Sequence, residues 1–487
     1  MTLKIFNTQS HKKEPFEARE TGKVGIYACG ITAYDVCHVG HARSAVVFDV
    51  ITRYLRYLGM EVLYVKNFTD VDDKIIARAQ REGRSITEIA ERFIREHDED
   101  MDALGVARPT KSPRATEHID GMIALVTTLI AKGHAYEMDG DVYFAVESFP
   151  GYGKLSGRNL EEMLAGARVD VNEKKRNPFD FVLWKASKEG EPAWESPWGP
   201  GRPGWHIECS VMSQRYLGNS FDIHGGGEDL VFPHHENEVA QSEGATGEPL
   251  ARYWVHNGFV RVNSEKMSKS LGNFFTIRDI LKQCDPEVLR FFLLQSHYRS
   301  PIDFSDAALA ESRQGLNRFY AALQAIDERL AAPARLPGGA GSARERELAE
   351  HIDTLQDRFR EAMDDDFNTA RATACLFETV RLINAALAEK PAALSAATLA
   401  RAGEILREIA AILGLLGRSP AAYLEQDRQR EAAKRGLDPA QIASLIAERR
   451  AAREDKAWQR ADEIRQGLAA QGVILQDGPT ETTWSIP

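Results

Sequence analysis

The chain has 487 residues, of which 43% are hydrophobic and 27% charged, so it can bury a large core and divide into several domains. No apolar run reaches the ~20 residues that a membrane-spanning helix needs, and Met1 to Glu20 is unlike a secretory signal, so we expect a cytoplasmic protein with no membrane partner. The formal net charge of −11 argues against indiscriminate binding to nucleic acid, and any RNA must therefore bind a local basic patch.

The opening of the chain predicts a Rossmann-like fold. Apolar residues cluster at 24–28 and at 62–68, which predicts two strands. Between them, 44–58 has helical periodicity and is followed by Gly59, a residue that commonly ends helices. Because strand, loop, helix and strand form the first unit of a parallel sheet, we expect an α/β fold with a Rossmann-like, parallel-sheet catalytic domain.

The middle of the chain predicts an insertion. The segment from about 114 to 201 has its own strand signal at 141–146, several Pro and Gly turns, and a tryptophan-rich stretch at 184–198. Motifs that carry chemistry resume at Gly204. We therefore interpret 114–201 as an insertion within a catalytic domain that covers 1–305.

The last third of the chain predicts helices. Beyond Asp306, strand signals almost vanish, and Ala, Leu, Arg and Glu recur at helical spacing. A loop at 331–343 and a second break at 418–439 interrupt this pattern. We expect a helical bundle over 306–417, followed by a small C-terminal domain over 418–487.

Two short motifs carry cations suited to phosphate. The first strand ends at Cys29-Gly30, and a short loop leads to His38-Val39-Gly40-His41 at the start of the next helix, where backbone donors and the helix dipole favour phosphate. In the second motif, Lys266-Met267-Ser268-Lys269-Ser270, two lysines stand beside a glycine hinge that could close over a triphosphate. Each motif alone is a weak signal.

Together and in this order, the two motifs resemble the ATP motifs of the class I aminoacyl-tRNA synthetases, with Val39 in place of the commoner Ile. The stretches 204–210 and 221–238 resemble the cysteine-specific branch, and the resemblance extends essentially from end to end. It implies ATP-dependent ligation of L-cysteine to tRNA(Cys) through a cysteinyl-adenylate, with Mg²⁺ accompanying ATP. It also implies that the bundle over 306–417 binds tRNA and that 418–487 is an anticodon-binding domain. The catalytic residues that it implies are His38, His41, Lys266 and Lys269; the ATP-binding residues are His38, Gly40, His41, Gly227, Asp229, Lys266, Met267 and Lys269.

The five cysteines are odd in number and scattered, which favours reduced thiols over a disulfide framework. His234 and Glu238 stand four apart on an expected helical turn, and Cys29 and Cys209 each close a predicted strand. Two thiolates, one imidazole and one carboxylate make a plausible zinc set, and the resemblance implies one Zn²⁺ per chain on these four. From spacing alone they could instead be buried core residues. The competing ligands are Cys37, assigned to packing, and His206, His224 and His235, assigned to the surroundings of the metal or the substrate pocket.

The glycines 225–227 would let backbone approach a ligand closely, and Asp229 could accept hydrogen bonds from ribose hydroxyls; a plain flexible turn is the alternative. We assign the substrate pocket to Trp205, His206 and His224, although a core tryptophan fits Trp205 equally well.

Four basic residues near the C-terminus recur at spacings of four, three and four, which predicts one helical face. Trp458 stands among them and could stack on a base. The same stretch contains Glu and Asp, so a face of ion pairs is the alternative; the resemblance favours an anticodon-binding patch. The predicted tRNA-binding residues are Arg449, Arg453, Lys456, Trp458 and Arg460.

We expect a monomer. Two alternative functions share parts of this pattern: a ligase that joins cysteine to an amino sugar, and a non-catalytic, zinc-stabilised RNA-binding module. A ligase that acts on an amino sugar would not need the helical region beyond Asp306. A non-catalytic RNA-binding module would not need the two cationic motifs, which are intact in this chain.

Overall fold

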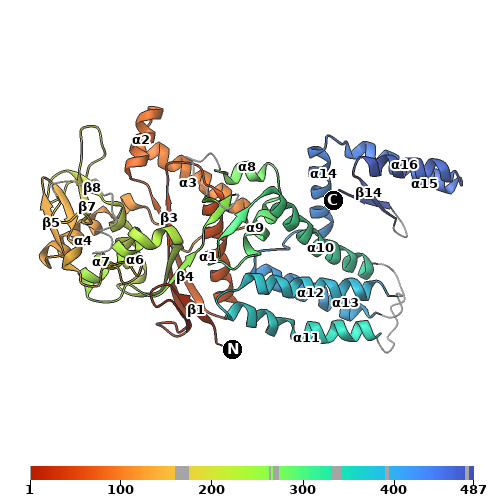
Figure 1. The fold of residues 1–487 in the computed structure, drawn as a ribbon, viewed down its shortest axis with the longest axis horizontal. Helices are drawn as coiled ribbons and strands as arrows, with labels where there is room; N and C mark the ends of the chain where they lie inside the picture. Colours follow the sequence, from red (N-terminus) through yellow and green to blue (C-terminus); the bar gives the residue numbers. More distant parts are fainter. Residues whose placement is uncertain are drawn as a thin grey trace. The chain divides into compact units, whose positions relative to one another are not determined.

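The computed structural model divides into two compact units, each described below by itself (Figure 1). The first comprises Met1–Ile280, Leu293–Ser305 and Asp357–Thr373; the second comprises Leu281–Phe292, Asp306–Gln356 and Ala374–Pro487. The residues described are 2–159, 175–262, 265–266 (backbone only), 274–331, 342–389, 394–477 and 482–486. Among them, no helix is both long enough and apolar enough to cross a membrane.

The first unit is built on a parallel sheet of four strands in the order β10-β9-β3-β4. This confirms the predicted α/β fold. The strand bounds are β3 (Lys23–Thr32), β4 (Glu61–Thr69), β9 (Phe221–Gly227) and β10 (Ala251–Asn257). The register of β3 against β4 shifts between Ala28 and Ile31. A Cβ atom on Gly30 would lie 1.6 Å from the carbonyl oxygen of Asn67, so only glycine fits at this shift.

Helix α1 (Val39–Tyr57) follows β3 and begins five residues before the predicted start at Ser44. The prediction was wrong because the first histidine motif is itself the cap of the helix. The His38 Nδ1 accepts from the Gly40 amide at 3.1 Å, and the His41 Nδ1 accepts from the His38 amide at 3.2 Å. This reciprocal capping box closes the helix N-terminus and fixes both imidazoles there.

The predicted insertion contains an antiparallel sheet in the order β5-β6-β7-β8, which lies beside α4 in Figure 1. Its core is continuous with that of the parallel sheet, because Trp184 and Val126 belong to the same buried cluster as Cys29 and Cys209. The insertion therefore supports the helices that carry the candidate site. The bounds are α4 (Ile119–Ala131), β5 (Ala135–Met138), β6 (Asp141–Phe144), β7 (Phe181–Ala186) and β8 (Gly201–Pro203).

The remaining elements of the first unit surround the parallel sheet. They are β1 (Lys4–Asn7), β2 (Lys12–Pro15), α2 (Asp73–Glu82), α3 (Ile86–Ala103), η1 (Ala115–His118), η2 (Val146–Ser148), α6 (Trp205–Leu217), η3 (Glu228–Leu230), η4 (Val231–His235), α7 (Glu236–Thr246), β11 (Val260–Val262), β12 (Glu265–Lys266), α8 (Ile277–Leu281) and β13 (Ile302–Phe304).

The second unit is helical, as the periodicity predicts, and ends in a β-hairpin that the sequence did not predict. The prediction of a break at 418–439 was wrong, because α14 occupies most of this segment. Proline does not interrupt the helix here, since Pro420 lies in its first turn, where the missing backbone N–H would have no partner within the helix. Tyr423 of this helix stacks on Tyr320 with ring centroids 3.9 Å apart. The bounds are α9 (Pro286–Leu294), α10 (Asp306–Ala331), α11 (Ala343–Asp364), α12 (Thr369–Leu387), α13 (Ala396–Ile412), α14 (Pro420–Lys434), α15 (Pro439–Glu454), α16 (Trp458–Ala470), β14 (Ile474–Asp477) and β15 (Thr482–Ser485). The end of α9 from residue 293, the end of α11 from residue 357 and the start of α12 up to residue 373 belong to the first unit.

Candidate metal centre and nucleotide pocket

Four buried side chains from three separate segments meet beside the carboxyl end of β3. This strand supplies Cys29, α6 supplies Cys209, and the η4–α7 segment supplies His234 and Glu238. Cys209 was predicted to lie at the end of a strand, and this prediction was wrong. Cys209 lies in the first turns of α6. The segment is helical because it runs without strand-like alternation from Gly204 to Gly218, whose φ of 85° ends the helix.

The four predicted zinc ligands converge on one point. The two sulfur atoms lie 3.5 Å apart, the Cys29 Sγ lies 3.2 Å from the Glu238 Oε1, and that oxygen lies 3.0 Å from the His234 Nε2. All four donor atoms lie within 4.8 Å of one another. A tetrahedral zinc ion with bonds of about 2.0–2.3 Å separates its donors by about 3.3–3.8 Å. The spacing and the chemistry of these side chains therefore fit zinc.

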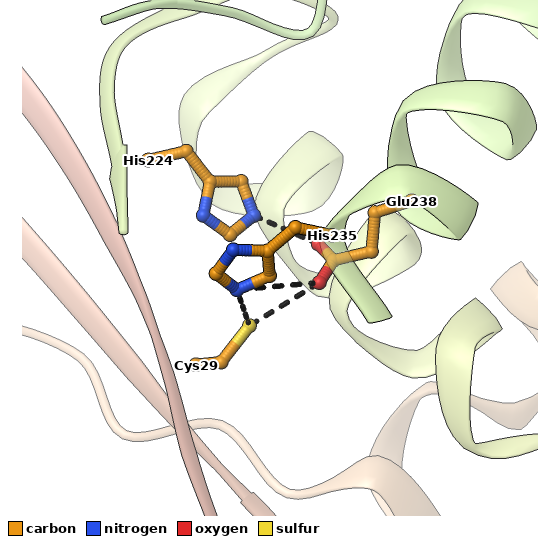
Figure 2. Close-up of side chains that lie close together, drawn as sticks. All are labelled: Cys29, His224, His235 and Glu238. Carbon is orange, nitrogen blue, oxygen red and sulfur yellow. Dashed lines mark hydrogen bonds and ion pairs between the residues drawn. The ribbon is translucent and has the colours of Figure 1, made fainter. Parts of the chain in front are cut away.

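A second set of donors shares two of these residues. Figure 2 shows Cys29, His224, His235 and Glu238, which also form a group able to hold a metal ion. The His235 Nε2 lies 3.3 Å from the Cys29 Sγ, and the His224 Nε2 lies 2.7 Å from the Glu238 Oε2. The Glu238 Oε1 faces Cys29 and His234 and lies 4.0 Å from the His235 Nε2, whereas the Glu238 Oε2 faces His224. Spacing in the sequence could not distinguish the two donor sets.

The pKa shifts of the clustered side chains favour the binding of a cation. Burial opposes the charge on Glu238, but the charges of His224 and His234 outweigh burial and hold its pKa well below the usual range. Burial also opposes the charge on His234, yet Glu238 raises its pKa to about 10. Burial raises the pKa of Cys29, so its thiol stays protonated and donates to Cys209. A dication can replace these protons when it binds.

Five of the eight predicted ATP-binding residues, His38, Gly40, His41, Gly227 and Asp229, line a cavity of about 430 Å³ next to the metal cluster. His38 and His41 stack at 3.7 Å between ring centroids at the N-terminus of α1. Gly227 and Asp229 line the cavity too, whereas a Cβ on Gly225 would lie 2.2 Å from the Val255 oxygen, so packing alone requires that glycine. The cavity-lining residues from the predictions are Cys29, Gly30, His38, Gly40, His41, Trp205, Gly227 and Asp229.

The second cationic motif falls mostly outside the described residues. Lys266 belongs to β12, which pairs with β11, but its side chain is not described. Met267 and Lys269 lie outside the described residues altogether.

Of the three residues predicted to line the substrate pocket, Trp205 lines the cavity, whereas His206 and His224 lie beside the metal cluster. Trp205 is 39% exposed, stacks on His234 at 4.2 Å between ring centroids, and lines the cavity. The His206 Nδ1 lies 2.9 Å from the His234 Nδ1. His224 is fully buried against Glu238 and Trp254, on the side of the carboxylate away from His234. Cys37, assigned to packing, is buried, and burial raises its pKa to about 12.

The sequence did not reveal two further residues near the cluster. The His256 Nε2 lies 2.8 Å from the His235 Nδ1, and the His256 Nδ1 lies 2.8 Å from the Thr8 Oγ1. A line of contacts therefore runs from Thr8 through both imidazoles to Cys29. His256 stands near the carboxyl end of a buried parallel strand, the edge where functional side chains gather, and that position was the available signal.

The basic residues near the C-terminus do not share one helical face. Helix α15 ends at Glu454, Lys456 adopts a positive φ of 61°, and α16 begins at Trp458. That prediction was wrong because a left-handed residue interrupts the helix where the spacing looked continuous. Arg449 is buried and its guanidinium pairs through two nitrogens with Asp477, at 2.6 and 2.7 Å.

The other basic residues also have acidic neighbours, as the alternative interpretation expected. Arg453 lies 3.1 Å from Asp477, and Arg460 lies 2.7 Å from Glu448. Trp458 is 58% exposed and Lys456 is exposed as well. Of the five predicted tRNA contacts, all but Arg449 are therefore exposed, and Arg453 and Arg460 already pair with carboxylates.

Comparisons with known families cover three parts of the chain. Residues 15–314 match the model for the tRNA synthetases class I (C) catalytic domain, 358–417 match the DALR domain, and 436–484 match the cysteinyl-tRNA ligase anticodon binding domain. The second and third matches lie in the region where the sequence predicted helices.

Curated relatives match over the whole length. The chain is 59% identical over 487 residues to the cysteine–tRNA ligase of Geobacter sulfurreducens and 57% identical over 491 residues to that of Trichlorobacter lovleyi, with 100% of each chain covered. Among solved structures, it resembles Mycobacterium tuberculosis methionyl-tRNA synthetase bound to methionyl-adenylate, with a TM-score of 0.61 and 18% identity over 86% of this chain and 95% of that one. The structural likeness supports the fold alone.

Proposed function

The chain belongs to the cysteine–tRNA ligases, and from this premise we propose that it couples L-cysteine to tRNA(Cys) through a cysteinyl-adenylate, with a zinc ion selecting the substrate thiolate. The observation that carries the proposal is the convergence of two thiols, an imidazole and a carboxylate at the wall of the nucleotide cavity. Amino acid and ATP would then meet at the carboxyl end of β3, close to the N-terminus of α1.

We place the zinc ion on Cys29, Cys209, His234 and Glu238. Of the two donor sets, this one has the second thiolate, a ligand that zinc favours. It also adjoins Trp205, which stacks on His234 and lines the cavity, so a substrate can reach it. His224 and His235 then orient Glu238 and Cys29 through hydrogen bonds. A bound zinc ion supplies a Lewis acid that lowers a thiol pKa and binds thiolate better than alkoxide.

A zinc ion that binds the substrate thiolate would explain how the enzyme selects cysteine over serine. Serine differs from cysteine by one atom, and a purely steric pocket rejects such an isostere weakly. Rejection by ~10⁴-fold needs ~5.5 kcal/mol, more than the van der Waals contacts of one atom provide. The preference of zinc for a sulfur ligand over an oxygen ligand can supply this free-energy difference, and a separate editing site is then unnecessary.

Adenylate formation requires little covalent chemistry from the protein. The cysteine carboxylate attacks the α-phosphorus of ATP and pyrophosphate leaves. The terminal ribose hydroxyl of the tRNA later attacks the carbonyl of the adenylate, takes the acyl group and releases AMP. His38 and His41 at the helix N-terminus hold the phosphates, and Lys266 and Lys269 offset the charge that develops with Mg²⁺ present. Losing one such contact typically costs ~3 kcal/mol. Asp229 would hold the ribose.

Recognition of tRNA is proposed for the helical part of the chain. Residues 306–417 would form a bundle that binds tRNA, and 418–487 would bind the anticodon, which agrees with the family matches at 358–417 and 436–484. Trp458 and Lys456 are the strongest candidates because they are exposed, whereas Arg449 stabilises the fold through Asp477. A monomeric state and a cytoplasmic location stay predictions.

The decisive assay is amino-acid-dependent exchange of labelled pyrophosphate into ATP, run over all twenty amino acids and followed by charging of tRNA(Cys). We expect exchange with cysteine only, loss of exchange after chelation, and its return with zinc. Exchange with cysteine but transfer to an amino sugar rather than to tRNA would support the alternative ligase. RNA binding without exchange would support the non-catalytic module.

A further inference from the structure

Arg43 is a buried cation in α1, two residues beyond His41. Its side chain is among the largest that are fully buried, with an exposed fraction of 0%. Burial lowers its pKa to about 10, so the guanidinium still carries its charge at neutral pH. No carboxylate among the described residues forms an ion pair with it. Because a buried charge without a counter-ion is costly, other groups must stabilise it.

Backbone carbonyl oxygens take the place of a carboxylate around Arg43. Its Nη1 donates to the Phe259 oxygen at 3.2 Å. Its Nη2 contacts three oxygens of a second segment, those of His297 at 3.3 Å, Tyr298 at 3.1 Å and Ser300. A planar guanidinium donates in several fixed directions at once, which the ammonium of a lysine cannot reproduce. The side chain therefore ties α1 to two other segments of the chain.

These two segments are also joined to each other through their backbones. The Gly258 amide donates to the Tyr298 oxygen at 2.9 Å, and a Cβ on Gly258 would lie 2.6 Å from the Arg299 oxygen. The strand that follows Gly258, β11, pairs in parallel with β13. The guanidinium of Arg43 therefore binds a hydrogen-bonded unit of two segments rather than a single loop.

One of the two segments forms a wall of the nucleotide cavity. Residues 257–260 line the same cavity as His38 and His41. They lead into β11, which pairs with β12, the strand that contains Lys266. Arg43 thus connects the helix that begins with the first cationic motif to the segment that leads toward the second.

We propose that Arg43 is a positioning residue for adenylate formation, because its contacts set the spacing between the start of α1 and the cavity wall at 257–260. The proposal rests on the proposed function and deepens it, since it names a residue that acts on the reaction without lining the cavity. A misplacement of about 1 Å at a reacting centre can lower the rate by ~10²-fold. Contacts that tighten in the transition state suffer more from such a shift than contacts that bind the substrates.

The test compares three zinc-loaded variants with the wild-type full chain. Arg43→Lys can keep the charge but not the planar donors, and Arg43→Met keeps neither. Gly258→Ala leaves α1 unchanged but pushes the wall away from 299–300, since its methyl group would meet their backbone. Arg290→Lys is the control, because Arg290 is a buried arginine of the second unit whose Nε donates to the Leu413 oxygen at 2.8 Å.

The measurements are kcat and KM for cysteine in pyrophosphate exchange, at a temperature where each variant is folded, together with thermal unfolding. We expect both Arg43 variants and Gly258→Ala to lower kcat by ~10²-fold, with KM for cysteine within about twofold of the wild type. KM should hold because cysteine binds at the metal cluster, which these substitutions leave in place. The control should unfold at a lower temperature and keep its kcat.

A wild-type kcat in Arg43→Lys would overturn the proposal, because the charge alone would then suffice. A wild-type kcat in Gly258→Ala would overturn it as well, since the position of the wall would not matter. If the Arg43 variants lose activity only in proportion to their unfolded fraction, the residue is structural and the proposal is wrong. If they do not fold, Gly258→Ala decides. A wild-type protein without cysteine-dependent exchange would instead overturn the proposed function itself.

Discussion

The metal cluster and the basic C-terminal segment were both predicted as binding sites from short patterns of residues, and they turned out differently. The cluster gathers donors from β3, α6 and the η4–α7 segment, which are far apart in sequence, and all four donor atoms lie within 4.8 Å of one another. At the C-terminus, by contrast, Arg449 and Arg460 already have carboxylates to pair with.

The comparison shows what kind of pattern identifies a site. Donors brought together from distant segments have few explanations other than a shared ligand, because burying such polar groups without one is costly. Basic residues at helical spacing are often balanced by acids on the same surface. We therefore expect substitutions in the cluster to abolish function and substitutions at the C-terminus to have graded effects.

The largest effect should follow Cys209→Ala. Removing one thiolate leaves three donors, and we expect zinc content near zero and cysteine-dependent pyrophosphate exchange reduced by ~10³-fold or more, since metal affinity and substrate selection share this ligand. Metal analysis and exchange kinetics measure both. Cys375→Ala, on α12 in the second unit, is the matched control and should change neither. Full cysteine affinity in metal-free Cys209→Ala would refute the assignment.

His41→Ala should separate the phosphate contacts from the metal. We expect a ~10²–10³-fold slower exchange at saturating substrates, because a donor that stabilises the transition state is lost. Cysteine binding to the metal, followed on the cobalt-substituted protein, should hardly change. His134→Ala, in the insertion, serves as the control. Parallel losses in exchange and cysteine binding would instead mean that His41 supports the whole cavity.

Trp458→Ala should weaken tRNA charging without touching adenylate formation. Stacking of a base on an aromatic side chain contributes ~1–3 kcal/mol, so we expect about a tenfold loss in kcat/KM for tRNA. Pyrophosphate exchange should match the wild type. Ile474→Ala removes another exposed apolar side chain from the same region, at 48% exposed, and should leave charging intact. Equal effects of the two substitutions would remove the case for stacking.

The smallest effect should come from Asp477→Asn, which tests the structural role of Arg449. The paired guanidinium holds the pKa of Asp477 well below its usual range. A depressed carboxyl pKa stabilises the folded state above the unfolded value of ~3.9, and this contribution is lost as pH falls. We expect the variant to lose about 1 kcal/mol at pH 7, since Asp477 is partly exposed. The difference should begin to shrink below about pH 4 and vanish only when pH falls below the lowered pKa of Asp477. Thermal unfolding across pH measures this, and a difference that grows at low pH would be contrary to it.

The sequence was most informative where local pattern and tertiary structure agree. The parallel sheet was predicted from the apolar runs that form β3 and β4 and from the glycine that ends the helix between them. The helix start was misplaced because His38 caps the helix through its side chain, a role that hydrophobic periodicity does not reveal. Cys209 was expected at the end of a strand but lies within α6, where residues 207–213 are all buried, so this helix has no polar face that hydrophobic periodicity could reveal.

Contacts between distant segments were beyond the sequence. The resemblance named four metal ligands, but it could not show that His224 and His235 form a second donor set with Cys29 and Glu238. Nor could it show that His256 contacts His235, because this depends on the pairing of β10 with its neighbour β9. The turn at Lys456 escaped notice since a lysine gives no local sign of a positive φ.

X-ray absorption at the zinc edge tests the central claim most directly. The zinc-loaded protein should show two sulfur ligands, from Cys29 and Cys209, together with nitrogen and oxygen donors. Adding cysteine should raise the number of sulfur ligands to three, and adding serine should leave the spectrum unchanged. A spectrum that stays at two sulfurs with saturating cysteine, in protein that still catalyses cysteine-dependent exchange, would contradict selection of the substrate by its thiolate.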